Sequence, residues 1–129
     1  MPVFLLYNGV KEVNNMTTTR KPIKGVKTKF DRVIDGDTLS FIINCRLNRI
    51  DAPETKGVEK QLGQVAKNYL VERISQAHDI KIDIIDRDYY GRLLIELYID
   101  GENINNELVE HRLAEMYTPA HHNNGVLDI

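Results

Sequence analysis

Apolar residues alternate with polar ones, or gather in short β-branched runs, over five stretches of the chain. Both patterns are typical of strands. Polar turns separate most of these stretches. Pro53 ends the third, because proline has no amide hydrogen to give to a sheet. The predicted strands are Val26–Ile34, Thr38–Ile43, Cys45–Ile50, Ile80–Ile85 and Leu93–Ile99.

The hydrophobic period becomes helical in two places. Residues 58–76 predict one long helix, with most of its charged side chains opposite an apolar stripe. A second helix is predicted from Asn105, as its cap, to Glu115. Three strands, a helix, two strands and a helix indicate an α+β fold that is mainly β. The apolar positions expected to point inward are Val58, Leu62, Val65, Tyr69 and Ile74 in the first helix, and Leu108, Val109, Leu113 and Met116 in the second.

The two ends of the chain differ from its middle. Residues 3–13 predict a hairpin around Asn8-Gly9, packed on the domain or making a contact between copies through residues 1–19. A loose leader before Met16 is the alternative. The predicted divisions are an N-terminal extension at 1–22, a domain at 23–119 and a C-terminal tail at 120–129.

Composition places the chain among single-domain globular proteins. It has 129 residues, of which 42% are hydrophobic and 28% charged. Its one cysteine, Cys45, excludes an internal disulfide and is predicted to be a buried apolar group. No stretch is long enough to cross a bilayer. The first apolar run, Val3–Tyr7, is short for a signal peptide, so an intracellular location is favoured.

The net charge of −2 does not by itself indicate nucleic-acid binding. The segment Arg20–Lys29, however, carries five basic residues and no acid. Such a run can contact phosphates. A solvated arm or strand face is the alternative.

Two acids are placed where a metal ion could bind. Asp37 opens the second predicted strand and Asp51 closes the third. If those strands form an antiparallel pair, the two carboxylates meet at one rim and repel each other unless a cation lies between them. Oxygen ligands in an open site favour Ca²⁺ over Mg²⁺, and either over zinc. A plain turn at Asp35-Gly36-Asp37 and a plain strand exit at Asp51 are the alternatives.

Three other charged residues suit phosphodiester chemistry. Arg46, inside an apolar strand, and Arg92, after a glycine turn, could each hold two phosphate oxygens with a planar guanidinium. Glu54 lies three residues beyond Asp51 and could take a proton from an attacking water. A structural ion pair for Arg46, a surface charge for Arg92 and a helix-capping role for Glu54 are the alternatives.

In combination these residues resemble the staphylococcal nuclease (thermonuclease) family over about residues 24–119. The resemblance implies a five-stranded barrel of the oligonucleotide-binding type with two helices, and the family's third, C-terminal helix has no counterpart here. The motifs that carry it are Val33-Ile34-Asp35-Gly36-Asp37-Thr38-Leu39, Arg46-Leu47, Ile50-Asp51-Ala52-Pro53-Glu54-Thr55-Lys56, Tyr90-Gly91-Arg92, Tyr98-Ile99-Asp100-Gly101 and Asn106-Glu107-Leu108-Val109.

The resemblance also implies an activity, namely Ca²⁺-dependent hydrolysis of DNA and RNA, preferably single-stranded, to leave 3′-phosphates. A barrel that binds nucleic acid or protein without cutting is the alternative, although family members of that kind usually lack some of these acids and arginines. The implied roles are Ca²⁺ ligands for Asp37, Asp51 and the Ala52 carbonyl, an acid near the ion for Asp35, phosphate clamps for Arg46 and Arg92, a base for Glu54, and nucleotide contacts for Tyr89, Tyr90 and Tyr117.

Overall fold

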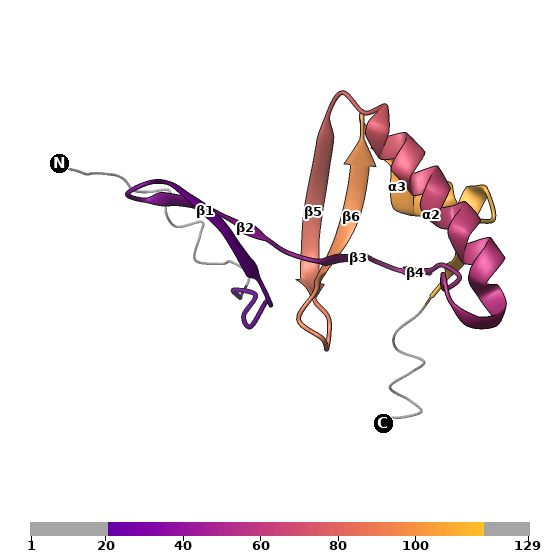
Figure 1. The fold of residues 1–129 in the computed structure, drawn as a ribbon, viewed down its shortest axis with the longest axis horizontal. Helices are drawn as coiled ribbons and strands as arrows, with labels where there is room; N and C mark the ends of the chain where they lie inside the picture. Colours follow the sequence, from indigo (N-terminus) through magenta and orange to yellow (C-terminus); the bar gives the residue numbers. More distant parts are fainter. Residues whose placement is uncertain (1–20, 118–129) are drawn as a thin grey trace.

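The computed structural model describes residues 21–117, shown in Figure 1. The predicted N-terminal hairpin, the contact between copies through residues 1–19 and the predicted tail therefore lie outside the described residues. The elements are β1 (Lys29–Asp35), β2 (Thr38–Ile42), β3 (Cys45–Leu47), β4 (Ile50–Asp51), the 3₁₀ turn η2 (Gly57–Glu59), α2 (Lys60–Ser75), β5 (Ile80–Arg87), β6 (Leu93–Ile99), β7 (Glu102–Asn103), α3 (Ile104–Glu110) and β8 (Glu115–Met116).

The strands form three open sheets. β6 is central, with β3 parallel to it on one side, β5 antiparallel on the other, and β7 also pairing with it. β1 and β2 form a separate antiparallel hairpin, and β4 pairs with β8. The α+β, mainly β prediction is confirmed. The described residues do not form a closed barrel, so closure remains a prediction.

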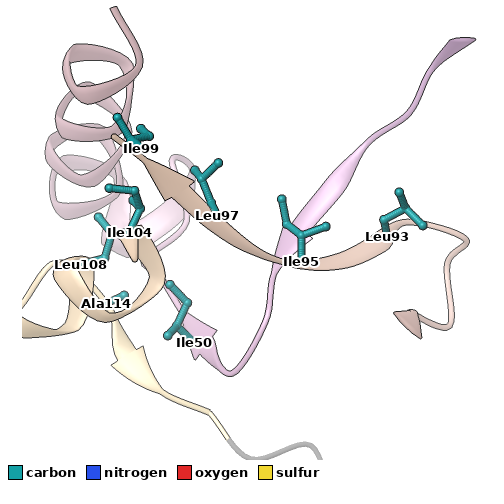
Figure 2. Packing of buried hydrophobic residues seen from close by; sticks show 8 residues of the cluster. All are labelled: Ile50, Leu93, Ile95, Leu97, Ile99, Ile104, Leu108 and Ala114. Carbon is teal, nitrogen blue, oxygen red and sulfur yellow. The ribbon is translucent and has the colours of Figure 1, made fainter. Parts of the chain in front are cut away.

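The hydrophobic core is built on one face of β6. Ile95, Leu97 and Ile99 point to that face at alternate positions, and all three are buried. Ile104 and Leu108 of α3 pack against them (Figure 2). Burying aliphatic side chains of this size stabilises the fold by roughly 1.5–3 kcal/mol each. The core thus fixes α3 against the central strand.

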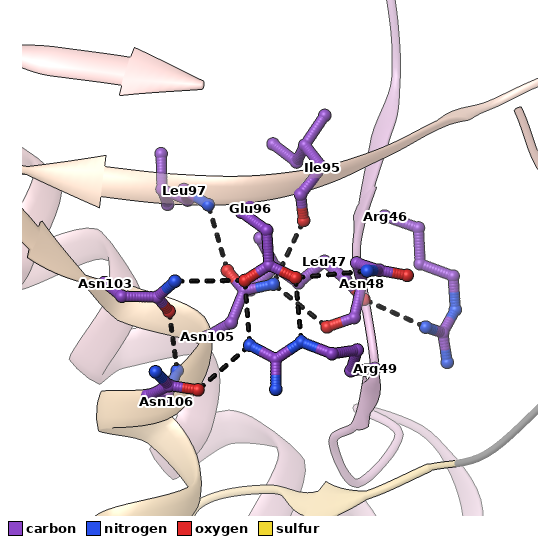
Figure 3. A network of polar contacts seen from close by, with 10 residues as sticks. All are labelled: Arg46, Leu47, Asn48, Arg49, Ile95, Glu96, Leu97, Asn103, Asn105 and Asn106. Carbon is purple, nitrogen blue, oxygen red and sulfur yellow. Dashed lines mark hydrogen bonds and ion pairs between the residues drawn. The ribbon is translucent and has the colours of Figure 1, made fainter. Parts of the chain in front are cut away.

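A buried amide ties the turn after β3 to β6 and α3. Asn105 is fully buried, and its Nδ2 donates to the carbonyls of Asn48 at 2.9 Å and Ile95 at 3.0 Å. Its Oδ1 accepts from the amide of Leu97 at 3.0 Å (Figure 3). Asn105 was predicted to cap α3, which is wrong. Asn103 is the cap, and its side chain accepts from the amide of Asn106 at 2.8 Å.

An ion pair extends this network. Glu96 accepts from Nε and Nη2 of Arg49 at 2.9 and 2.8 Å, and also from Asn48 and Asn103 (Figure 3). These hydrogen bonds, led by the one from Arg49, lower the pKa of Glu96 to about 2 despite its burial. Arg49 has a positive φ of 72°. It stands in the turn that breaks the predicted third strand into β3 and β4.

The long predicted helix is confirmed as α2, but of its predicted inward stripe only Tyr69 packs against the core. Gly63 and Ala66 are its buried residues. Val58, Leu62, Val65 and Ile74 are exposed, and Tyr69 is half-buried. α2 is held partly by polar contacts, since Arg73 donates to Glu107 of α3 at 2.7 Å. Small residues face inward because the loop before the helix lies directly against it.

Two further predictions about burial are corrected. Cys45 is exposed at the first position of β3. Met116 is exposed as well, because α3 ends at Glu110 and the chain then turns at Arg112, whose φ is 59°. Within residues 21–117, no helix has the length and apolar content needed to span a membrane.

Candidate active site

Four of the predicted site residues line one pocket of about 360 Å³. β3 supplies Arg46, β4 supplies Asp51, and the loop that follows supplies Ala52 and Glu54. The inner wall comes from α2, through residues that include Gly63, Ala66 and Leu70. The pocket therefore lies where the central sheet, the loop and the long helix meet.

Arg46 is held in place by the backbone around it. Its Nη1 donates to the carbonyls of Leu47 at 3.0 Å and Ile50 at 2.9 Å. Its Nη2 lies 3.4 Å from Oδ1 of Asp51, and its guanidinium lies 5.2 Å from the ring centre of Tyr117. The Arg46 side chain is 25% exposed and that of Asp51 is 61% exposed. An arginine fixed this way keeps donors at the pocket without moving to meet an anion.

The loop that carries Glu54 rests on α2. The Glu54 amide donates to Oε1 of Glu59 at 3.0 Å. A Cβ at Gly63 would lie only 2.0 Å from the Glu54 carbonyl oxygen. Only glycine therefore allows the helix and the loop to come this close. The Glu54 side chain is exposed beside the pocket.

Arg92 is fixed in a different turn. Oδ2 of Asp88 accepts from Nε of Arg92 at 2.6 Å, while Oδ1 accepts from the amides of Tyr90 and Arg92 at 2.9 Å each. Burial raises the pKa of Asp88, but the bonds from Arg92 and Tyr90 outweigh it and leave the pKa below its usual value. The guanidinium lies 5.5 Å from the ring centre of Tyr90, and Tyr89 is exposed beside it. Asp88 thus holds the arginine through Nε.

A second hollow lies at this turn. Lys27, Asn44, Tyr90, Gly91 and Arg92 line it. The Lys27 amide donates to the Gly91 carbonyl at 2.9 Å, so part of the basic segment predicted to meet phosphates lies beside Arg92. Lys21, Lys24, Lys27 and Lys29 are all exposed.

The remaining predicted acids lie on the β1–β2 hairpin. Asp35 ends β1 and Asp37 lies in the turn that follows, and both are exposed. Oδ1 of Asp37 accepts from Oγ1 of Thr38 at 3.1 Å. Hydrogen bonding with Asp37 lowers the pKa of Asp35.

The structure thus places the predicted residues in three groups. The first group lies at the pocket and consists of Arg46, Asp51, Ala52, Glu54 and Tyr117. The second lies in the β5–β6 turn and consists of Tyr89, Tyr90 and Arg92. The third lies on the hairpin and consists of Asp35 and Asp37. Asp37 and Asp51 were expected to meet at one rim if the second and third predicted strands formed an antiparallel pair. They do not form one, because β2 pairs with β1 and β3 pairs with β6. Between residues 21 and 117, three or more His, Cys, Asp or Glu side chains nowhere come together as a metal-binding group.

Two residues important to the site were missed from the sequence. Asp88 has a readable signal, since an aspartate opening a glycine turn commonly accepts from later backbone amides. Gly63 has a weaker signal, because a glycine inside a helical pattern costs stability unless packing requires it. Its actual partner, the Glu54 peptide, is visible only in the fold.

The structure is a small α+β domain with a pocket lined by an arginine and carboxylates. In it β3 pairs with β6 in parallel, β5 pairs with β6 in antiparallel, and α2 packs on the loop after β4. The sequence model of the family described as "Staphylococcal nuclease homologue" matches residues 44–127. The chain belongs to this family. The match begins directly after the hairpin that carries Asp35 and Asp37.

Three relatives of the chain are named as endonucleases. The chain is 31% identical over 126 residues to "Endonuclease YncB" of Bacillus subtilis, covering 88% of this chain and 60% of that protein. It is 32% identical over 107 residues to the "SPbeta prophage-derived endonuclease YokF" of the same organism, with 73% and 36% covered. An "Uncharacterized endonuclease" of Haemophilus influenzae is 32% identical over 97 residues, with 70% and 52% covered. The chain spans between about a third and three fifths of these relatives.

Proposed function

We propose that the protein is a Ca²⁺-dependent nuclease that hydrolyses phosphodiester bonds of DNA and RNA and leaves 3′-phosphates. The observation that carries the proposal is the pocket shared by Arg46, Asp51 and Glu54. In this pocket Arg46 is a fixed hydrogen-bond donor for a phosphate, and Asp51 is a carboxylate that can bind a hard cation. Glu54 is a second carboxylate that is free to act as a base. Three relatives are named endonucleases, which supports the same class.

The chemistry follows from the charge that builds on the phosphate. As water attacks, negative charge grows on the non-bridging oxygens, and Arg46 and Arg92 are the donors that would stabilise it. Each such fixed donor is typically worth about 3–4 kcal/mol. Glu54 would accept the proton of the attacking water. The backbone bonds of Arg46 and the Asp88 bond of Arg92 reduce the rearrangement that this requires.

The donor chemistry of the proposed metal ligands fits Ca²⁺. Asp37, Asp51 and the Ala52 carbonyl are all oxygen donors, as hard cations prefer. When bound, the ion would supply positive charge beside the scissile phosphate. Asp35, next to Asp37, would add negative charge to the site. Since Asp37 stands on the hairpin, this ligand set requires the hairpin to approach the pocket, as in the closed barrel that the family resemblance implies.

The proposed substrate is single-stranded or loosened nucleic acid. Tyr89 and Tyr90 are exposed, and exposed aromatic rings provide surfaces on which bases stack. Tyr117 lies against Arg46 and would place a base beside the clamp. The exposed lysines before β1 would add sequence-independent attraction to phosphates, which salt weakens.

The test is cleavage of labelled single-stranded DNA and RNA with Ca²⁺, with Mg²⁺ or with EGTA. We expect cutting with Ca²⁺ alone and products that end in 3′-phosphate. Arg46→Lys and Glu54→Gln should each lower the rate by about two or more orders of magnitude, since lysine has no planar fork and an amide accepts no proton. Binding without cutting would show instead a non-catalytic module.

Matched controls are available on exposed surfaces. Arg32→Lys and Glu110→Gln make the same chemical changes at exposed positions away from the pocket. Both should cleave at the wild-type rate. Equal rates for the pocket variants and the controls would refute the assigned roles.

A further inference from the structure

The turn between β3 and β4 has a backbone conformation that does not suit its residue. Arg49 has a φ of 72°, in the left-handed region that glycine adopts freely and other residues adopt only at a cost. Such a conformation persists only where the surrounding contacts hold it, and it is commonly found at functional sites. The side chain of Arg49 must therefore supply contacts that offset this cost.

One carboxylate on β6 anchors both residues of the turn (Figure 3). Glu96 accepts from Nε and Nη2 of Arg49 at 2.9 and 2.8 Å, and from Nδ2 of Asn48 at 3.1 Å. Asn103 also donates to Glu96, at 3.0 Å, and Nη2 of Arg49 donates to Oδ1 of Asn106 at 2.9 Å. The Glu96 side chain is only 11% exposed, so solvent screens this pair less than a surface pair. Because a forked pair fixes orientation as well as distance, it holds the turn against β6.

The backbone of the same turn holds the Arg46 guanidinium. Nη1 of Arg46 donates to the carbonyls of Leu47 and Ile50, which stand on either side of the turn. The Arg49 carbonyl accepts from the Tyr117 amide at 2.7 Å, and the Tyr117 ring centre lies 5.2 Å from the Arg46 guanidinium. The directions of these carbonyls depend on the backbone dihedral angles between them. The shape of the turn therefore decides where Nη1 of Arg46 lies.

Neither Arg49 nor Glu96 lines the pocket itself. The lining includes Arg46, Leu47 and Ile50 but not these two residues. Any effect of Glu96 on a bound substrate must therefore pass through the residues that it holds. Since its pKa is about 2, the carboxylate is charged at neutral pH and holds Arg49 throughout that range.

We propose that Glu96 is a positioning residue for the Arg46 guanidinium. By holding the Arg49 side chain, it fixes the turn whose carbonyls aim Arg46 into the pocket and keeps Tyr117 beside that guanidinium. For the rate of cleavage, this role rests on the proposed function, in which Arg46 stabilises charge on the phosphate. A donor already in place when charge develops needs no rearrangement, and a shift of about 1 Å can cost about a hundredfold in rate. Glu96 thus acts on the rate without contacting the substrate.

A second ion pair provides a matched control. Arg73 of α2 donates through Nε and Nη2 to Glu107 of α3 at 2.7 and 3.1 Å, and the Glu107 side chain is 16% exposed. This pair has the same forked geometry and similar burial, but it joins the two helices and not the β3–β4 turn. Glu107→Gln therefore makes the same chemical change as Glu96→Gln and should lower stability to a similar extent without moving Arg46.

The first test needs neither substrate nor metal. In protein whose arginines carry an NMR-active nitrogen isotope, the two Nη groups of Arg46 should give separate signals, because a held guanidinium turns slowly about its Nε–Cζ bond. Their absence in Arg46→Lys assigns them. We expect Glu96→Gln to lose the separate signals and Glu107→Gln to keep them. Separate signals in Glu96→Gln, their loss in both variants, or a wild type that shows none would overturn the proposal.

A second variant separates the Arg49 side chain from the backbone conformation. Glycine adopts a φ of 72° without strain, so Arg49→Gly leaves the turn able to form but removes its anchor. We expect this variant to lose the separate Arg46 signals, as Glu96→Gln does. It also decides the matter if Glu96→Gln does not fold. Wild-type signals in Arg49→Gly would show that the backbone alone aims Arg46, and would refute the role of Glu96.

The third test is cleavage of single-stranded DNA with Ca²⁺, at a temperature where every variant is folded. Glu96→Gln and Arg49→Gly should each lower kcat by about tenfold or more and change KM by less than about twofold, because the donor is misplaced mainly for the transition state. In the Arg46→Lys background, Glu96→Gln should lower the rate little further, since both changes act on one donor. Glu107→Gln should keep the wild-type kcat.

Two results in this assay would contradict the positioning role. They are an unchanged kcat in Glu96→Gln, and losses from Glu96→Gln and Arg46→Lys that multiply in full. A wild type that does not cleave would refute the proposed function instead, and the Arg46 signals would still decide the positioning.

Discussion

Replacing Gly63 by alanine has two opposing effects on stability, a gain in helix propensity and a loss in packing. In an ordinary helix the change stabilises a protein by about 1 kcal/mol. Here the added Cβ would lie 2.0 Å from the Glu54 carbonyl oxygen and 2.4 Å from its carbon. The Glu54 peptide would have to move by more than about 1 Å to restore ordinary contact, and overpacking of this kind costs roughly 1–3 kcal/mol. The packing cost should therefore exceed the propensity gain.

Gly63→Ala should lower the free energy of unfolding by about 1 kcal/mol, measured by urea denaturation. Because the displaced peptide belongs to the proposed base, cleavage should also fall by about a hundredfold. Gln64→Ala, at an exposed position of the same helix, is the matched control and should change neither quantity by much. A Gly63→Ala protein that is more stable than the wild type would show that the loop does not depend on this contact.

Three further predictions test the supports of the site. The pKa of Glu96 is lowered to about 2 from 4.5, so its stabilisation is complete above about pH 5 and is lost as pH falls toward 2. After a discount for solvent screening, ionised Glu96 contributes about 2 kcal/mol to the free energy of unfolding. Glu96→Gln should therefore flatten the dependence of this free energy on pH between about 2 and 5. Asn105→Asp should lower the free energy of unfolding, measured by urea denaturation, by about 3 kcal/mol or more, because a carboxylate would face the two carbonyls that now accept from Nδ2. An unchanged free energy of unfolding would contradict the assigned amide orientation. Asp88→Asn should lower kcat by roughly tenfold or more with little change in KM, as expected if it positions Arg92 for the transition state. An effect on KM alone would argue against that role.

Local patterns predicted most of the elements well. Leu93–Ile99 is found at its predicted bounds, and the long helix begins and ends within two residues of the prediction. The hydrophobic pattern did not predict the buried face of α2, because a stripe of large apolar residues was taken as the buried side. The buried side carries Gly63 and Ala66, since the loop backbone fills the space that larger side chains would need.

The candidate site was predictable in its members but not in its grouping. Ordered motifs named Arg46, Asp51 and Glu54, and these share a pocket. The motifs could not show that Arg46 is held by the carbonyls of Leu47 and Ile50, since no pattern of side chains records backbone acceptors.

By itself the sequence determined most of the strands, the two helices, the family and the residue types at the site, because each depends on neighbours along the chain. Only the tertiary structure decided which strands pair. β2 leads into β3 through Ile43 and Asn44 without turning back on it, and β3 pairs with β6, which lies over forty residues away in the sequence. Pairing between distant strands depends on which edges and apolar faces meet in space. That choice left Asp37 on an extended hairpin, away from the pocket that holds Asp51.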